Sequence, residues 1–264
     1  MSRYSSEQQQ AMADEFNREG IVILREHFPR EKMQAWADAF APLLQAHLGG
    51  LGNDSRGANR HYITLPFTGV FADESIFADP DVLAVVEKVA GRDPVICQLA
   101  SDTPLLGSDY QALHRDTPAL FPETGQETPS FQLAVNFPLC DVTLENGPFE
   151  TTRRTHRMLR DDAFAKVESG EIGIEAVPMQ LGDVMIRDVR ALHRGTPNKT
   201  DTPRPMVVIG YSRNWLNRPE VHIDIPQATW DQLSAQSRQL LRTNPVVKEI
   251  GALAREETYK SFMY

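Results

Sequence analysis

The stretch GDVMIRDVRALHRGTPNKTDTPRPMVVIGYS, residues 182–212, decides the fold. It predicts one strand over residues 183–189 and a second over 205–212, because both are apolar runs bounded by turn-forming residues. The connection between them is rich in Pro, Asn and Thr, and His193 lies at the far end of the first strand. Two strong strands joined by an irregular connection are typical of an all-β core.

Further strands are predicted at residues 95–100, 111–114, 131–142 and 174–179, with turn signals at Gly107, Gly147 and Gly182. The first third differs: helices are predicted at residues 6–19, 29–48 and 81–90, and a strand at 20–28. A last helix is expected at 229–241, followed by a helical tail. Many short strands after a helical start predict a mostly β jelly roll with helices packed on one sheet.

The boundaries follow from this change of pattern. We expect one domain over residues 1–264, with a helical and strand N-terminal portion at 1–94, a jelly-roll core at about 95–213 and a helical C-terminal extension at about 228–264. No internal repeat, low-complexity tract or linker divides the chain.

Composition excludes several classes of protein. The chain has 264 residues, of which 41% are hydrophobic and 24% charged, so it is not disordered, collagenous or built on disulfides. The net charge of −9 argues against nucleic acid as a partner. The N-terminus lacks the apolar core of a signal peptide, and no apolar run is long enough to cross a membrane, so we expect a soluble cytoplasmic protein with Cys97 and Cys140 as buried free thiols.

A metal site is indicated by LHRDT, residues 113–117. Side chains two positions apart on a strand share one face, so His114 and Asp116 could bind one ion. His193 is far enough downstream for the chain to return and supply a third ligand. Two imidazoles and a carboxylate with open positions are typical of non-haem Fe(II) oxygenases.

A rival His-x-Asp pair, His222 and Asp224, lacks a later histidine to complete the same order of ligands. Arg204 strengthens the first site, because a guanidinium on entry to the next strand could bind a dicarboxylate in a bidentate manner while the other end of that molecule chelates the metal.

The motifs HRD (114–116), ENGPF (145–149), TH (155–156), GD (182–183) and LHRGTPNKTDTPR (192–204) together resemble the phytanoyl-CoA dioxygenase family of iron(II)- and 2-oxoglutarate-dependent oxygenases. The resemblance covers roughly residues 95–213, and GIVILREHF (20–28) is similar to the family's N-terminal portion. Two departures lie outside the metal motif: Arg153-Arg154 stands where the family commonly has Pro-Gly, and Arg194 stands where glycine often follows the distal histidine.

The resemblance implies a double-stranded β-helix of the cupin-like kind. It also implies His114, Asp116 and His193 as the iron ligands and Arg204 as the anchor of 2-oxoglutarate, and we add Thr196 as a second cosubstrate contact. The implied reaction consumes O₂, releases succinate and CO₂ and is supported by ascorbate. Its expected outcome is hydroxylation of an unactivated C–H bond in a small metabolite or natural-product intermediate.

The substrate is less well defined by the sequence. His156 and Arg194 are weak candidates for substrate contacts, and the arginines around the motifs allow an anionic substrate, although most of them are expected to form a solvated rim. Two other classes stay open on the residues alone: a zinc-dependent hydrolase on a cupin-like barrel, and a non-catalytic jelly roll that binds a small molecule. The sequence does not define the oligomeric state.

Overall fold

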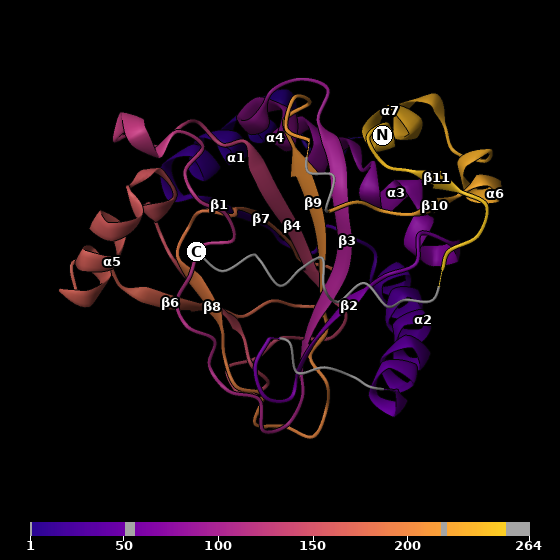
Figure 1. Ribbon diagram of the computed structural model, residues 1–264, viewed down its shortest axis with the longest axis horizontal. Coiled ribbons are helices and arrows are strands. Elements are labelled where there is room, and N and C mark those ends of the chain that lie inside the picture. Colours follow the sequence, from indigo (N-terminus) through magenta and orange to yellow (C-terminus); the bar gives the residue numbers. More distant parts are fainter. Residues whose placement is uncertain (1, 51–55, 218–220, 252–264) are drawn as a thin grey trace.

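The computed structural model describes residues 2–50, 56–217 and 221–251, and the structural statements below refer to these residues. Its centre is a six-stranded antiparallel sheet in the order β1-β7-β4-β9-β3-β2 (Figure 1). The strands are β1 (Ile21–Leu24), β7 (Val184–Asp188), β4 (Gln132–Pro138), β9 (Met206–Ser212), β3 (Val95–Pro104) and β2 (Arg60–Thr64). Neighbours in this sheet come from distant parts of the chain, as a jelly roll requires.

A second, three-stranded sheet has the order β6-β5-β8. It contains β6 (Ile174–Val177), β5 (Phe149–Thr152) and β8 (His193–Gly195). An isolated antiparallel bridge between His114 and His193 extends this sheet by one residue pair. The two sheets face each other across the cavity described below, which takes side chains from both of them.

Most of the helices lie on one side of the large sheet. The α-helices are α1 (Ser6–Glu19), α2 (Arg30–Gly49), α3 (Glu74–Phe77), α4 (Pro80–Ala90), α5 (Arg160–Glu168), α6 (Gln227–Trp230) and α7 (Ala235–Leu241). Three 3-10 turns, η1 (Gly69–Ala72), η2 (Pro122–Thr124) and η3 (Thr155–Arg157), and a short parallel pair, β10 (Ile225–Pro226) with β11 (Val246–Val247), complete the fold. Figure 1 shows α5 on the side of β6 and β8, away from α1, α2 and α4. No helix in the described ranges is long and apolar enough to cross a membrane.

Local sequence explains where α1 begins and ends. Ser5 and Gln8 form a reciprocal capping box at its N-terminus. Gly20 ends it with φ at 82°, a left-handed conformation that glycine adopts without steric cost. A side chain at Gly20 would also overlap the ring of His156, so the helix end is fixed by packing as well as by backbone conformation.

Strand alternation divides the large sheet into two faces. Leu133, Val135 and Phe137 of β4 join the main apolar core, which the helices cover. Trp36 of α2 meets Phe137 edge to face, with ring centroids 5.2 Å apart. The alternate β4 residues point the other way into the cavity, so one strand serves both the core and the site.

Several predicted elements are confirmed. The helix at 6–19 has its predicted bounds, the helix at 29–48 shifts by one residue, and the helix at 81–90 begins one residue earlier. The strands at 183–189 and 205–212 are each shortened. Both cysteines are free, although only Cys97 is fully buried.

Others are wrong. Residues 111–114 form no strand and contribute only the His114 bridge, because their backbone turns to aim the ligands inward. The helix predicted at 229–241 is broken into α6 and α7, since Ser234 caps a new helix. Residues 242–251 of the predicted helical tail are not helical, and the remaining tail lies outside the described residues.

Candidate active site

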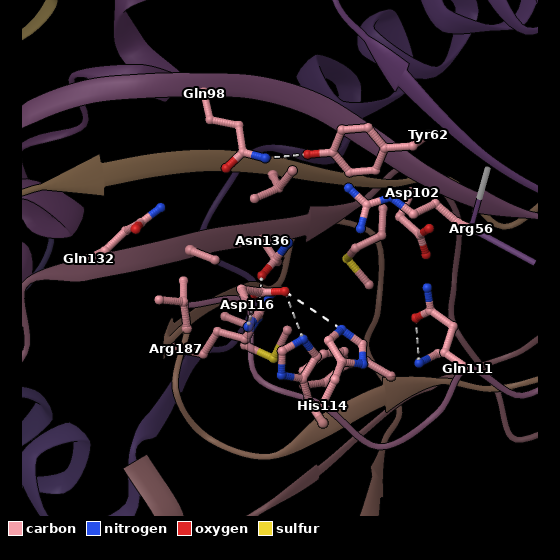
Figure 2. A pocket seen from close by; sticks show the side chains of 18 of the residues that line it. Arg56, Tyr62, Gln98, Asp102, Gln111, His114, Asp116, Gln132, Asn136 and Arg187 are labelled. Atoms are coloured by element: carbon pink, nitrogen blue, oxygen red, sulfur yellow. Dashed lines mark hydrogen bonds and ion pairs between the residues drawn. The ribbon is translucent and has the colours of Figure 1, made fainter. Parts of the chain in front are cut away.

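Three side chains converge between the two sheets. His114 and Asp116 follow a loop beside β8, and His193 begins β8, so the backbone pairing of His114 with His193 fixes their separation. Each offers a ligand atom, and these atoms all lie within 4.8 Å of one another. Oδ1 of Asp116 is 3.6 Å from Nε2 of His114 and 3.3 Å from Nε2 of His193 (Figure 2). The predicted ligands are therefore brought together.

The tautomers of both histidines suit metal binding. Nδ1 of His114 lies 2.7 Å from the carbonyl oxygen of Ala112, and Nδ1 of His193 lies 2.8 Å from that of Ala191. A carbonyl can only accept, so both Nδ1 atoms carry hydrogen and both Nε2 lone pairs are directed toward the site. Burial lowers the pKa of His193 to about 4, which leaves this imidazole neutral and able to bind a metal at neutral pH.

Asp116 is held as a carboxylate with one oxygen available to the metal. Burial opposes its ionisation, but the cationic Arg187 helps overcome that effect and hold the pKa of Asp116 well below its usual range. Arg187 approaches Oδ2 with Nη1 at 3.0 Å and donates from Nε to Asn136 at 3.2 Å. Its guanidinium also lies over the ring of Phe149, 5.0 Å from the centroid. Arg187 therefore fixes the carboxylate plane and leaves Oδ1 facing the histidines.

Arg204 lies at the rim of the same cavity with only 2% of its surface exposed. Burial lowers the pKa of Arg204 to about 10, so the side chain remains cationic at neutral pH. Its Nε is buried and has no hydrogen-bond partner among the described residues, and Asp102 is 3.9 Å from Nη2. A buried cation with an unsatisfied donor fits the carboxylate of a cosubstrate that the protein itself does not contain.

A second arginine supports this end of the cavity. Arg60 of β2 is fully buried and binds Asp102 at 2.9 Å and the carbonyl oxygen of Thr196 at 2.7 Å. Its guanidinium packs against the Cα of Gly195, where a side chain would collide with Arg60 and with Gln111. Gly195 is therefore needed for close approach of Arg60, and Arg60 neutralises Asp102 beside Arg204.

The cavity has a volume of about 820 Å³, including the part open to solvent. Several polar residues that line the cavity were not identified from the sequence: Tyr62, Gln98, Asp102, Gln111, Gln132, Asn136 and Arg187. A signal for them is present in the sequence, because Gln98 and Asp102 alternate with core residues along one strand, as Gln132 and Asn136 do along another. Polar residues at every second or fourth position of an apolar strand indicate a face that lines a site rather than the core.

Three other predicted contacts do not line this cavity. The Thr196 hydroxyl donates to the carbonyl of Pro148 at 2.7 Å, and Gly195 occupies the cavity wall in its place. Arg194 points to the opposite face of β8, where it binds Glu150 at 2.7 Å and lies over Tyr110. His156 is buried beside Phe16 and Gly20 behind the sheet. None of the three is placed to contact a ligand in the cavity.

Three of the arginines around the motifs do not belong to the solvated rim that was expected for most of them. Arg187 lines the cavity, and Arg115 and Arg190 are fully buried, both binding Glu127, at 2.7 and 2.9 Å. Arg115 also donates to the carbonyls of Thr155 and Met158. The residue between the two ligands of HRD thus ties the metal loop to the segment at 155–158 instead of facing solvent.

A second cluster of possible ligands, His27, Asp79 and Asp81, has a different function. Asp79 accepts from the backbone N–H groups of Asp81 and Val82 at the start of α4. Asp81 accepts from the backbone of Arg3 and from Gln9. These carboxylates cap the helix and anchor the N-terminal segment, which gives the cluster a structural role.

Comparison with known proteins agrees with the geometry. The sequence profile of the family described as Phytanoyl-CoA dioxygenase (PhyH) matches residues 16–206, which includes all three ligands and Arg204. This is most of the chain and extends well beyond the motif segments.

Solved structures of related shape include an alpha-ketoglutarate-dependent enzyme and two proteins solved with 2-oxoglutarate bound. The non-haem alpha-ketoglutarate-dependent carbocyclase SnoK from nogalamycin biosynthesis is 18% identical, with a TM-score of 0.62, covering 80% of this chain and 87% of SnoK. HygX from Streptomyces hygroscopicus, solved with nickel, 2-oxoglutarate and hygromycin B, is 17% identical, with a TM-score of 0.58 and coverages of 82% and 89%. EctD from S. alaskensis, solved with 2-oxoglutarate and 5-hydroxyectoine, is 21% identical, with a TM-score of 0.60 and coverages of 82% and 79%. The predicted jelly-roll fold is confirmed.

Proposed function

We propose, since this chain belongs to the phytanoyl-CoA dioxygenase family and is an iron(II)- and 2-oxoglutarate-dependent oxygenase, that it hydroxylates an unactivated C–H bond of a small metabolite or natural-product intermediate. In this reaction the substrate C–H, O₂ and 2-oxoglutarate give the alcohol, succinate and CO₂. Family membership also argues against the two alternatives left open by the sequence, a zinc-dependent hydrolase and a non-catalytic binding protein.

The observation that carries the proposal is the shared direction of three donors. Both Nε2 atoms and Oδ1 of Asp116 face one point, while the Nδ1–H groups are held by backbone carbonyls. Bound iron with O₂ and 2-oxoglutarate supplies the oxidising power, and the protein contributes geometry, enclosure and orientation.

Different side chains of the protein would bind the metal and the cosubstrate. His114, Asp116 and His193 would hold the metal on one side and leave the cavity side open. Arg204 would bind the distal carboxylate of 2-oxoglutarate, because its buried guanidinium has an unsatisfied donor. Because Asp116 keeps a carboxylate in the ligand set, halide has no position there, and hydroxylation is favoured over halogenation.

Asp116→Ala tests the assignment. We expect loss of metal-dependent succinate release to below about 1% of wild type, since removing a ligand commonly costs orders of magnitude in metal affinity or rate. Succinate is measured under Fe(II), ascorbate and 2-oxoglutarate, with Asp162→Ala on the exposed side of α5 as the matched control. Undiminished turnover by the Asp116 variant would remove this residue from the metal's ligands.

A further inference from the structure

The wall opposite the metal ligands is built from amides. Gln98 of β3 and Gln132 of β4 line the cavity from the large sheet, and Tyr62 of β2 lines it beside Gln98. Gln98 donates from Nε2 to the Tyr62 hydroxyl. Figure 2 shows Gln98 and Tyr62 across the cavity from His114 and Asp116, with Gln132 further along the same wall.

The charges on the cavity wall are already paired within the protein. Asp102 binds the fully buried Arg60 at 2.9 Å, and Asp116 binds Arg187 at 3.0 Å. Arg204 is reserved for the cosubstrate under the proposed function. Arg56 lies over the ring of Tyr62, 4.5 Å from its centroid. Arg56 is only partly buried, so a charged group held among the buried residues of this wall would have to separate one of the two ion pairs.

The energetic difference between charged and neutral groups is large. Burying a charge without a counter-ion costs much more free energy than burying a hydroxyl or carbonyl, and the neutral group regains its cost by hydrogen bonding. A carboxamide offers both an acceptor oxygen and donor hydrogens, so it can pair with either group. Two amides facing one cavity consequently favour neutral hydrogen-bonding groups over ions.

The sheet surface beside the two amides is apolar and carries few long side chains. Ala134 and Val208 line it, and Val189 lies at its edge. Gly210 lies between Gln98 and Ala134 in the sheet, and a Cβ there would come within 2.8 Å of Cβ of Gln98. The glycine thus allows Gln98 to fold against the sheet, and the small neighbouring side chains leave space for the flat face of a ring.

We infer that the substrate is a neutral ring compound, with one apolar face on Ala134 and Val208 and hydroxyl or carbonyl groups at its edge bound by Gln98 and Gln132. This inference rests on the proposed function, because it assigns the charged groups of the site to metal and cosubstrate. It makes Gln98 and Gln132 residues that determine specificity, and it replaces the anionic substrate that the sequence alone allowed.

The test uses matched ligands that differ only in charge. Protein loaded with nickel and 2-oxoglutarate, so that turnover does not compete with binding, is titrated by saturation-transfer NMR. One set is methyl β-glucopyranoside with its uronic acid and its 6-amino analogue, and the second is benzyl alcohol with benzoate and benzylamine. We expect at least one neutral member to bind about tenfold more tightly than both of its charged analogues.

Variants locate the effect on the amides. Gln98→Leu and Gln132→Leu are expected to weaken binding of the neutral ligand about fivefold each, the effect of losing one neutral hydrogen bond, with unchanged affinity for nickel and 2-oxoglutarate. The exposed Gln126 supplies the control, Gln126→Leu, which should bind as wild type does.

Several results would overturn the inference: equal or tighter binding of a charged analogue, no binding of either neutral ligand, or wild-type affinity in both glutamine variants. Failure of the wild-type protein to bind nickel and 2-oxoglutarate is a different result, and it would count against the proposed function itself. The two failures are thus distinguished within one set of titrations.

Discussion

Gly195→Ala is a one-carbon change that should disable the cosubstrate end of the site. The added Cβ would lie 2.6 Å from Cζ of Arg60 and 2.8 Å from Oε1 of Gln111. An exposed arginine would move aside at little cost, but the guanidinium of Arg60 is fully buried. It can move only by giving up its bonds to Asp102 at 2.9 Å and to the Thr196 carbonyl at 2.7 Å.

The magnitude follows from those bonds. A hydrogen bond to a charged group contributes about 1.5–3 kcal/mol, and a buried pair that is broken leaves its charges without compensation. Partial loss of both bonds predicts a decrease of about 3 kcal/mol in the free energy of unfolding. For a chain of this size each kcal/mol corresponds to about 2–4 °C in Tm, so we expect Tm to fall by about 6–12 °C.

A double-mutant cycle isolates the cost of the collision. It compares the free energies of unfolding, from urea and thermal unfolding, of Gly195→Ala, Arg60→Ala and the double variant. Once Arg60 is shortened, only the end of the Gln111 side chain has to move aside for the alanine at 195, so the additional cost should fall to below about 1 kcal/mol. The reasoning fails if Gly195→Ala unfolds within 2 °C of wild type, or if its cost is the same with and without Arg60. Gly173→Ala, where an added Cβ meets nothing within 4 Å, is the matched control.

Further predictions address charge and reactivity. Arg204→Lys should raise KM for 2-oxoglutarate about 10- to 100-fold in succinate assays, because lysine keeps the charge but not the bidentate fork, and an unchanged KM would exclude this anchor. For Asp188, burial opposes ionisation, but Arg190 and Ser130 hold its pKa below 3.8, so its contribution to stability is present above pH 3.8 and lost as pH falls through the lower folded value. Asp188→Asn should therefore be about 2–3 kcal/mol less stable than wild type at pH 7 in urea unfolding, with a gap that narrows below pH 3.8, and a gap independent of pH would contradict this assignment. Burial raises the pKa of Cys140 from 9.0 to about 11, so at pH 8 about 100-fold less thiolate is present and iodoacetamide should label it correspondingly slowly by mass spectrometry. Labelling of Cys140 at the rate of the urea-unfolded chain would contradict that shift.

The metal ligands could be predicted from the sequence because their chemistry is local. His114 and Asp116 are two positions apart along the chain, and His193 is followed by a recognisable strand that begins after Arg204. Residue type and order were enough, since few combinations of side chains suit this metal. The bounds of α1 could be predicted for the same reason, because the residues that cap it lie at its own two ends.

The prediction of a strand at 111–114 fails for a physical reason that applies more widely. His114 must point inward beside His193, while Arg115 must turn back to Glu127 and to the 155–158 segment. A regular strand would place Arg115 simply on the opposite face, without these carbonyl contacts. Buried charge pairs, which periodicity does not reveal, therefore override the local extended preference.

The specificity of the site could not be predicted for a related reason. Strand alternation indicates that Gln98 and Gln132 avoid the core, but it does not say which strands become neighbours. Only the order β4-β9-β3 places Gly210 between Gln98 and Ala134, where the absence of a side chain leaves space for a ring. Likewise, Gly195 is an ordinary strand residue until β2 brings Arg60 against it. A site that depends on residue type and order can be predicted from the sequence. A site that depends on contacts between strands can be predicted only when the strand order and register are known.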